Sequence, residues 1–474
     1  MSEEEQSAVA AAIAGEPPSW AEGEGLHRRL RQRQLTMMAI GGAIGVGLFL
    51  GSSVTIRLAG PAVIVSYLLG AVLALIMAYV LAEMAVVYPV SGAFGVYAEK
   101  YINPWAGFAV RATYSVAQII AVGAEVTAAG IYISFWLPNV PQWISVVLVS
   151  AALVAVNATE VNYLGEFEYW FAMIKVAAIV AFIIVGLALI FGVGFPHAVG
   201  LANLTQHGGF LPMGWKGVWL SLAITVSSFM GVEIIAVSAG EAERPQVTIP
   251  RAMRSIVYRL ILFYVLAIAI MVTMVPWNQA NSSSSLSGSP FVAAFSAAHI
   301  PFAAGIMNFV VLTAALSSVN ANLYLATRMT FSLGRSGHIP AWMGKTGRNG
   351  VPHRALLAST AGMISAILLA VFAPKNAFLM LYGVAVAGML FVWLVVLRTH
   401  LRFRSALTHE QLASLPVRIS AHPVPTVVGI LMIAGIAITT FFVDGLQWSV
   451  PAFLVYLGIV SLLYMANRSG VNRV

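Results

Sequence analysis

The sequence predicts an all-α protein that crosses a membrane many times, and three observations support this fold class. Of the 474 residues, 60% are hydrophobic and only 9% are charged, and a mean hydropathy of +0.89 excludes a soluble globular domain. Runs of about 20 apolar residues, the length of a membrane-spanning helix, recur along the whole chain. We therefore expect a polytopic membrane protein with about twelve transmembrane helices.

The chain also lacks the features of several other functional classes. It contains no cysteine, which excludes disulfides and thiolate metal sites. The glutamate-rich N-terminal segment argues against a cleaved secretory signal. No phosphate-binding loop, histidine–acid–serine arrangement or metal-spaced cluster stands out, which weighs against an ATP-driven pump and against a membrane enzyme. We expect no catalytic residue, no metal, no cofactor and no nucleic-acid partner.

The expected helices divide the chain into four parts. Residues 1–34 are a cytosolic tail, 35–400 carry helices 1–10, 401–423 are a cytosolic loop, and 424–474 carry helices 11–12 with a short C-terminal tail. Prolines occur where helices could begin, at Pro61, Pro104, Pro141 and Pro250. The expected spans lie near 36–58, 61–88, 104–137, 141–158, 167–193, 215–240, 251–275, 291–333, 354–373, 376–398, 424–442 and 446–466.

The basic residues predict the orientation of these spans. With the N-terminus inside, all Lys and Arg except Arg57, Lys175, Lys216 and Lys375 fall in the tail, in even-numbered loops or at the adjoining helix ends. An excess of Lys and Arg marks the cytosolic side of a membrane protein. Both termini are therefore expected to be cytosolic.

A glycine cluster interrupts the first apolar run. Residues 41–47 read GGAIGVG, and each glycine in a helix interior costs about 1 kcal/mol relative to alanine. Two interpretations fit the motif alone. The small residues form a close helix-packing face, or they mark a helix broken within the membrane, which is tolerated only where it is buried in protein or lines a cavity.

The sixth expected span contains a second interruption. Residues 227–233 read SSFMGVE, with two serines, a glycine and an acid at mid-membrane. If helices 1–5 and 6–10 are inverted repeats, the two interruptions occupy matching positions. Paired broken helices of this kind mark the substrate site of a transporter, so the pairing favours the interpretation of the glycines as a break.

Three ionisable residues lie within spans and away from their ends: Glu125, Lys175 and Glu233. Each costs at least ~2.5 kcal/mol at the bilayer centre and should face the protein interior or a wet cavity. Each is then either a buried ion pair or hydrogen-bonded strut, or a group that gains and loses a proton during transport. Both interpretations stay open for all three.

Other polar residues give weaker signals. Glu83 lies near a cytosolic helix end, which favours a structural or gating role. Glu160, Glu166 and Glu168 cluster at the loop between helices 4 and 5, which is compatible with solvated side chains. Helix 8 carries four polar residues that either offer polar contacts or only bridge neighbouring helices. They are Ser317, Ser318, Asn320 and Asn322.

Several stretches together resemble one family. Residues 35–51 read LTMMAIGGAIGVGLFLG and residues 168–176 read EYWFAMIKV; further matching stretches are 81–86, 88–94, 240–245, 249–252, 316–320 and 332–335. On these residues the chain resembles the bacterial amino-acid permeases of the amino acid–polyamine–organocation (APC) superfamily, in the branch of aromatic amino acid, lysine, proline and GABA permeases. The resemblance runs from about residue 26 to 405.

The resemblance implies a five-plus-five inverted-repeat (LeuT-like) fold with discontinuous helices 1 and 6 and two further helices. In this family the helix-1 break binds the substrate carboxylate through backbone N–H groups, here those of Gly45, Val46 and Gly47. The substrate ammonium is expected at backbone carbonyls of the broken helices, and Phe229 lines or gates the pocket. The residues that would supply those carbonyls are Ile40, Ala43, Ser227 and Met230.

The resemblance also assigns expected roles to ionisable residues. Lys175 matches a helix-5 lysine that stands where sodium-coupled relatives hold a cation, and its expected neighbours are the helix-1 break and Ser317. Glu233 matches a helix-6 acid linked to substrate or proton coupling. Helix 3 departs from the family pattern between Arg111 and Gln118. Because helix 3 borders the side-chain pocket, the side chain of the substrate stays open.

The expected function is import of an amino acid across the bacterial cytoplasmic membrane by alternating access, coupled to protons as a symporter. Its expected partners are the amino acid, protons and the lipid bilayer, with the proton gradient as driving force. An amino-acid exchanger and a non-transporting amino-acid receptor are the alternatives. The sequence does not assign an oligomeric state.

Overall fold

The computed structural model is built from helices and their connections, and no strand occurs in the part that it describes. The described residues are 44–90, 92–158, 161–194, 197–237, 239, 246–251, 253, 260–278, 291–292, 302–348, 350–372, 377–443 and 446–471. The expected N-terminal tail and the residues 40 and 43 of the expected site lie outside this set.

Long helices form the frame of the molecule. The helices of 23 residues or more are α4 (Val63–Val87), α6 (Pro104–Ile133), α8 (Val161–Phe191), α14 (Ala303–Arg335), α17 (Ala377–Ser405) and α20 (Ser449–Val471). The shorter helices are α3 (Ser52–Ala59), α5 (Ala93–Tyr101), α7 (Gln142–Asn157), α9 (Gly214–Thr225), α10 (Ile234–Val237), α12 (Ala267–Met274), α15 (His353–Ser359), α16 (Ala361–Phe372), α18 (His409–Ser414) and α19 (Val424–Thr439). Short π-helical and 3-10 turns join them.

Among the described residues, 8 helical segments are long and apolar enough to cross a membrane. Two further apolar helices, Gln142–Asn157 and Leu262–Met274, are shorter. The first long segment, Gly47–Val87, covers part of the first expected span and nearly all of the second, and the expected sixth span is interrupted. The polytopic helical class is thus present in the structure, while the number of twelve spans and the inverted repeat stay predictions.

The corner between the first two expected spans lies at Gly60 and Pro61. Gly60 adopts φ 62° and ψ −146°, a conformation that a residue with a side chain rarely adopts, and Pro61 follows within a 3-10 turn before α4. Pro104 likewise stands at the start of α6, where the Asn103 side chain accepts a hydrogen bond of 2.8 Å from the Ala106 N–H. These prolines begin helices as the sequence predicts.

Several boundaries differ from expectation. Helix α14 begins at Ala303 rather than near 291, and α20 continues to Val471 rather than ending near 466. Helix α8 begins at Val161, six residues before the expected start at 167, and α17 continues to Ser405 rather than ending near 398. Residues 401–405 of the expected loop are therefore helical. The reason is that charged residues end an apolar run but not the helix itself, which continues beyond the hydrocarbon.

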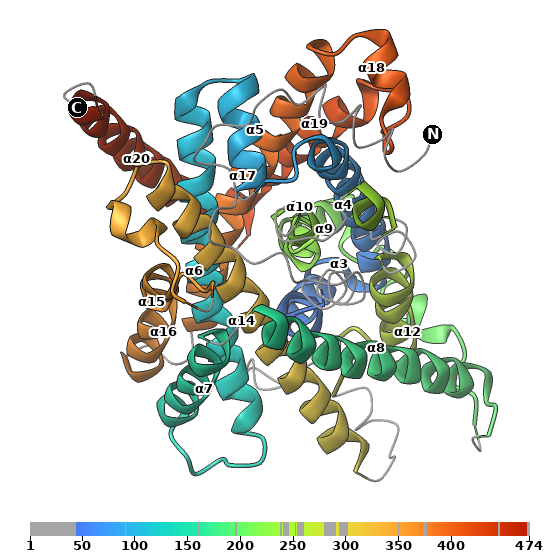
Figure 1. Ribbon diagram of the computed structural model, residues 1–474. Helices are drawn as coiled ribbons and strands as arrows, with labels where there is room; N and C mark the ends of the chain where they lie inside the picture. Colours follow the sequence, from blue (N-terminus) through green and yellow to red (C-terminus); the bar gives the residue numbers. More distant parts are fainter. Residues whose placement is uncertain are drawn as a thin grey trace.

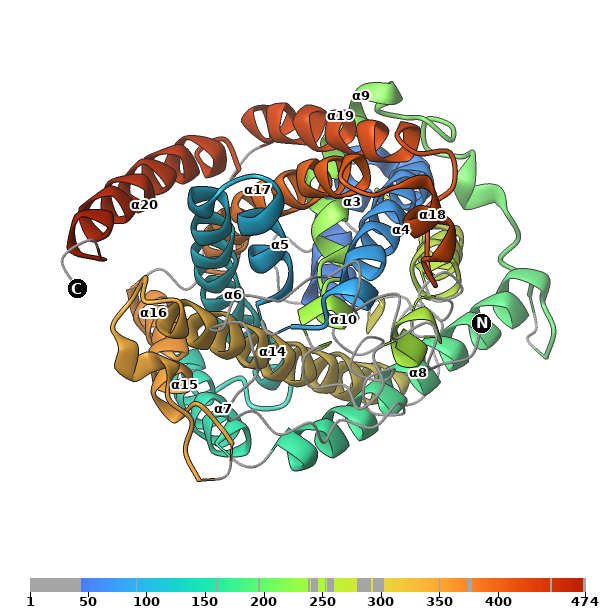
Figure 2. The ribbon, with the colours of Figure 1, turned by 45° about the horizontal axis from the view of Figure 1, so that its top comes forward.

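Helices α3 and α10 lie in the interior, with α4, α6, α14 and α17 around them (Figures 1 and 2), and α9 packs against α3, α4 and α19. Helix α6 packs against α14, α17 and α5. In α14 the most apolar 18-residue window is 78% buried, whereas in α20, at the edge of the molecule in both views, it is 17% buried. Of the residues expected to carry function, Ser317 lies on the buried α14, whereas Lys175 lies on α8, whose most apolar window is 39% buried.

One ion pair fixes the end of α4. Glu83 is buried and accepts hydrogen bonds from Arg404 Nε, from Arg404 Nη2 at 2.8 Å and from the Ile419 N–H at 2.9 Å. These contacts join α4 to α17 and to the segment before α19. They favour the structural interpretation of Glu83.

Candidate functional site

The first described residues form a bend that opens into a helix. Ile44 and Gly45 lie in the bend, the Leu48 N–H donates to the Gly45 carbonyl at 3.2 Å, and a π-helical turn (Gly47–Gly51) continues into α3. The first N–H groups of a helix have no partner within it and form the positive end of its dipole. The N–H groups of Gly45, Val46 and Gly47 lie at this end of the helix.

The glycines of this turn also permit close packing. A Cβ on Gly45 would lie 2.5 Å from Ser318 Oγ, and a Cβ on Gly47 would lie 2.9 Å from Tyr382 Oη and 3.0 Å from Ser228 Cα. Real Cβ atoms hardly ever approach so closely, so α14, α17 and the second interruption can contact this turn only because it lacks side chains there. The packing face and the backbone irregularity are thus properties of the same residues.

The second interruption divides the sixth expected span. Helix α9 gives way to a 3-10 turn (Val226–Phe229), Met230 is extended with φ −60° and ψ 142°, and Gly231 has φ 107° before α10 begins at Ile234. The Gly231 N–H donates to Glu233 Oε2 at 3.0 Å, so the acid of this motif binds the broken backbone beside it. The break lies within the stretch 227–233 that the sequence indicates.

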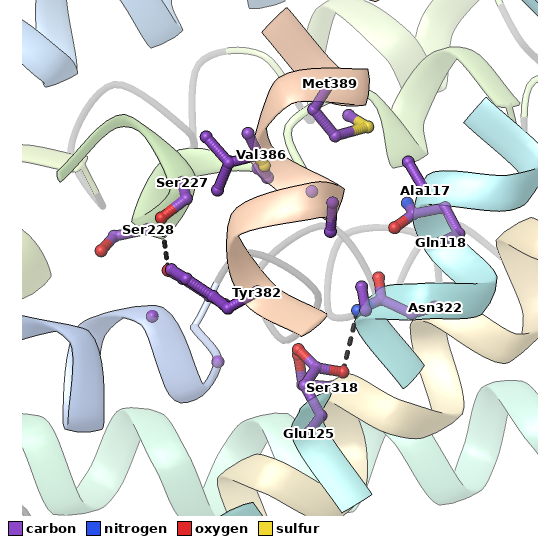
Figure 3. A pocket seen from close by; sticks show the side chains of 16 residues that line it. Ala117, Gln118, Glu125, Ser227, Ser228, Ser318, Asn322, Tyr382, Val386 and Met389 are labelled. Atoms are coloured by element: carbon purple, nitrogen blue, oxygen red, sulfur yellow. Dashed lines mark hydrogen bonds between the residues drawn. The ribbon is translucent and has the colours of Figure 1, made fainter. Parts of the chain in front are cut away.

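A cavity lies between the two irregular segments (Figure 3). Its walls come from both breaks and from α6, α14 and α17. The lining residues include Gly45, Gly47, Ser227, Ser228, Met230, Ala117, Gln118, Ala121, Glu125, Ser318, Asn322 and Tyr382. Four of the predicted site residues, Gly45, Gly47, Ser227 and Met230, therefore meet at one cavity.

Tyr382 connects the second break to α17, and sequence reasoning missed it. Ser227 Oγ donates to the Ile224 carbonyl at 2.5 Å and is hydrogen-bonded to Tyr382 Oη, which therefore donates to the serine (Figure 3). A tyrosine in an apolar run resembles an ordinary buried aromatic residue, so only its three-dimensional position identifies it.

Glu125 faces this cavity from α6. Ser318 Oγ donates to Glu125 Oε1, and Asn322 Nδ2 donates to Glu125 Oε2 at 2.9 Å (Figure 3). The residue is 8% exposed. Glu125 is thus a buried acid. The two residues of α14 that contact it, Ser318 and Asn322, belong to the polar residues that the sequence places in helix 8.

Lys175 lies at the start of the first break. Its side chain is fully buried, and Nζ donates to the Ile44 carbonyl at 3.1 Å and to Ser317 Oγ at 2.8 Å. These are the two neighbours expected for it. The ammonium therefore contacts the backbone carbonyl that directly precedes Gly45.

The interpretation of Glu168 as a solvated residue is wrong. Glu168 is fully buried, accepts a hydrogen bond from Ser317 Oγ and accepts another from Asn320 Nδ2 at 3.3 Å. The reason is that α8 begins at Val161, so that Glu168 lies well inside the helix rather than in a loop. Its spacing of seven residues from Lys175 puts both on one helix face, a signal that was present in the sequence.

Glu233 and Phe229 lie beside the cavity but do not line it. Glu233 is buried and accepts a hydrogen bond of 3.5 Å from Tyr114 Oη. Phe229 is fully buried, with its ring centroid 4.8 Å from that of Tyr264 and 6.0 Å from that of Tyr67. The structure therefore brings Lys175 and Ser317 to the bend at Ile44 and places Phe229 in the aromatic packing behind the second interruption.

Comparisons with known proteins agree with this geometry. The family model described as "Amino acid permease" matches residues 34–470. The chain is 39% identical over 445 residues to a gamma-aminobutyric acid permease of Bacillus subtilis (strain 168), covering 94% of each chain. It is 37% identical to a probable threonine/serine transporter of the same organism, covering 93% of this chain and 94% of the relative. It is 37% identical to the aromatic amino acid transport protein AroP of Escherichia coli (strain K12), covering 92% and 95%.

Proposed function

The chain belongs to the amino acid permease family, and on that premise we propose that it imports an amino acid across the bacterial cytoplasmic membrane together with protons, by alternating access. The observation that carries the proposal is a cavity lined by both the bend at residues 45–47 and the interruption at residues 227–231, beside a buried lysine. Irregular backbone at such a position supplies unpaired polar groups to a ligand.

The two ends of an amino acid fit the two breaks. The substrate carboxylate binds the N–H groups of Gly45, Val46 and Gly47, because a helix N-terminus attracts an anion. The ammonium binds carbonyls near the second break, those of Ser227 and Met230. The further carbonyls expected from residues 40 and 43 lie outside the described residues.

Lys175 connects this site to the proton. A charged Nζ holds the Ile44 carbonyl by an ion–dipole hydrogen bond that is stronger than the bond a neutral amine makes. Loss of the proton therefore weakens the contact between α8 and the first break. The charged and the neutral form of Lys175 therefore favour different conformations of the first break. This difference couples the transport of the substrate to the movement of a proton.

The lining of the cavity is mixed. Gln118, Glu125 and Asn322 contribute amide and carboxyl groups, whereas Val386 and Met389 contribute apolar surface. This lining accommodates both polar and apolar substrate side chains, so a panel of amino acids is needed to identify the substrate. The amino acids in the names of the relatives supply the test panel: GABA, threonine, serine and the aromatic amino acids.

A thermal-shift screen of the purified protein against this panel identifies the ligand, because a compound that binds only the folded state raises the apparent Tm. Uptake of the labelled ligand into proteoliposomes then tests transport. A proton-coupled importer accumulates it under an inward proton gradient and loses that accumulation when a protonophore is added. Uptake that requires internal substrate and ignores the protonophore would indicate the exchanger, and binding without any flux would indicate the receptor.

A further inference from the structure

The hydrogen-bond network of Lys175 continues beyond Ser317 to Glu168. Lys175 Nζ donates to Ser317 Oγ at 2.8 Å, and the same hydroxyl donates its own proton to Glu168 Oε1. A hydroxyl that accepts from an ammonium and donates to a carboxylate can pass a proton between them, since it receives one proton as it releases another. All three side chains are fully buried.

We propose that Glu168 is the proton acceptor of Lys175, with the Ser317 hydroxyl as the relay between them. In the transfer an N–H bond of Lys175 breaks and a new O–H bond forms on Ser317. The original O–H bond of Ser317 breaks, and an O–H bond forms on Glu168 Oε1. The products are a neutral amine and a neutral carboxylic acid, so no other reactant is needed. This inference depends on the proton coupling proposed above and adds a residue to it.

The surroundings of Glu168 hold it in place for this role. Asn320 Nδ2 donates to the second carboxylate oxygen at 3.3 Å, and Asn157 Nδ2 from α7 donates to Asn320 Oδ1 at 2.6 Å. Glu125 from α6 interacts electrostatically with both Lys175 and Glu168. One carboxylate oxygen of Glu168 is therefore held by Asn320, which Asn157 holds in turn, and the other accepts the hydrogen bond from Ser317.

The position of Glu168 along α8 gives the transfer a direction. It precedes Lys175 by seven residues, about 10 Å along the helix axis. The predicted topology puts the N-terminal end of α8 on the cytosolic side. Transfer from Lys175 to Glu168 thus moves the proton away from the first break and toward the cytosol, which is the direction that an importer requires.

The test compares Glu168→Gln with Glu166→Gln in proteoliposomes. Both changes replace an acid of α8 by its amide, but Glu166 is only half-buried and lies on a different face of the helix. For Glu168→Gln we expect substrate affinity and counterflow against internal substrate within about twofold of wild type. We expect gradient-driven accumulation to fall about tenfold or more, with loss of substrate-evoked proton influx. Glu166→Gln should resemble wild type in all four measurements.

Proton-coupled accumulation by Glu168→Gln at the wild-type level and with the wild-type pH profile would overturn the proposal. An equal loss of counterflow and accumulation would also overturn it, because that pattern indicates a structural role. If Glu168→Gln does not fold, Ser317→Ala replaces it, since that change removes the relay hydroxyl and keeps both ionisable groups. Failure of wild type to couple to protons would refute the proposed function itself, a result distinct from any of these.

Discussion

At the scale of the residue, the glycines at the first break have two effects at once. Gly45 and Gly47 stand at a helix N-terminus, and their lack of side chains lets Ser318, Ser228 and Tyr382 approach the backbone. A side chain at either position would displace the groups that form the cavity wall. The sequence favours a break over a packing face, but the structure shows that the same glycines also form a close packing face.

The close packing at Gly47 predicts the effect of the substitution Gly47→Ala. The added Cβ meets Tyr382 Oη and the Ser228 backbone, and overpacking of this kind costs about 1–3 kcal/mol. We expect the Kd for the amino acid to rise about tenfold or more while the protein still folds, with a larger rise for Gly47→Val. Isothermal titration of the purified protein measures the affinity.

Gly51→Ala is the matched control for this prediction. Its Cβ would lie 3.5 Å from Tyr382 Oη and 3.7 Å from Ile224 Cγ2, which are ordinary contacts. Affinity should stay close to that of wild type. Equal affinities for the two alanine variants would contradict the importance of close approach at Gly47.

At the scale of the element, the sequence predicts where helices begin better than what their side chains contact. Pro61 and Pro104 mark observed helix starts, and the stretch 227–233 contains the observed interruption, because proline and glycine act on the local backbone. Glu168 was misplaced because its burial depends on how far α8 extends beyond its apolar run. Tyr382 was missed because nothing local distinguishes it from other buried aromatic residues.

A prediction at the scale of the element concerns Gly60, at the corner before α4. Gly60 has φ 62°, and a Cβ on it would collide with Pro212 Cγ. Gly60→Ala should therefore lower the apparent Tm by several degrees, since it adds steric overlap to backbone strain of about 1–3 kcal/mol. Thermal unfolding in detergent, followed by tryptophan fluorescence, measures this.

Gly194→Ala separates the two causes. Gly194 also has a positive φ, 78°, but a Cβ there would have nothing within 4 Å. We expect a smaller loss of Tm from this variant, caused by backbone strain alone. A loss as large as that of Gly60→Ala would show that packing against Pro212 contributes nothing.

At the scale of the whole molecule, the helical membrane class follows from composition, and the family follows from motifs distributed over most of the chain. Orientation in the membrane follows only from the distribution of Lys and Arg. The packing of α6, α14 and α17 around the cavity depends on contacts between residues far apart in sequence. No local pattern encodes those contacts, so the structure was needed to identify Glu125 and Gln118 as lining residues.

The predicted orientation is directly testable because the chain has no cysteine. Gln206 and Ser405 are both exposed, and the topology places Gln206 outside and Ser405 in the cytosol. In intact cells a membrane-impermeant maleimide should label Gln206→Cys and leave Ser405→Cys unlabelled until the membrane is permeabilised. The reverse pattern would invert the topology and, with it, the direction of proton release.

The central claim is that an amino acid and a proton cross together through the site at Lys175. The most direct measurement is the internal pH of proteoliposomes after external substrate is added without an imposed gradient. Wild-type vesicles should acidify, whereas Lys175→Ala vesicles should bind the substrate and show no acidification. Uptake of labelled amino acid by wild type without any change of internal pH, or acidification by Lys175→Ala at the wild-type rate, would contradict the claim.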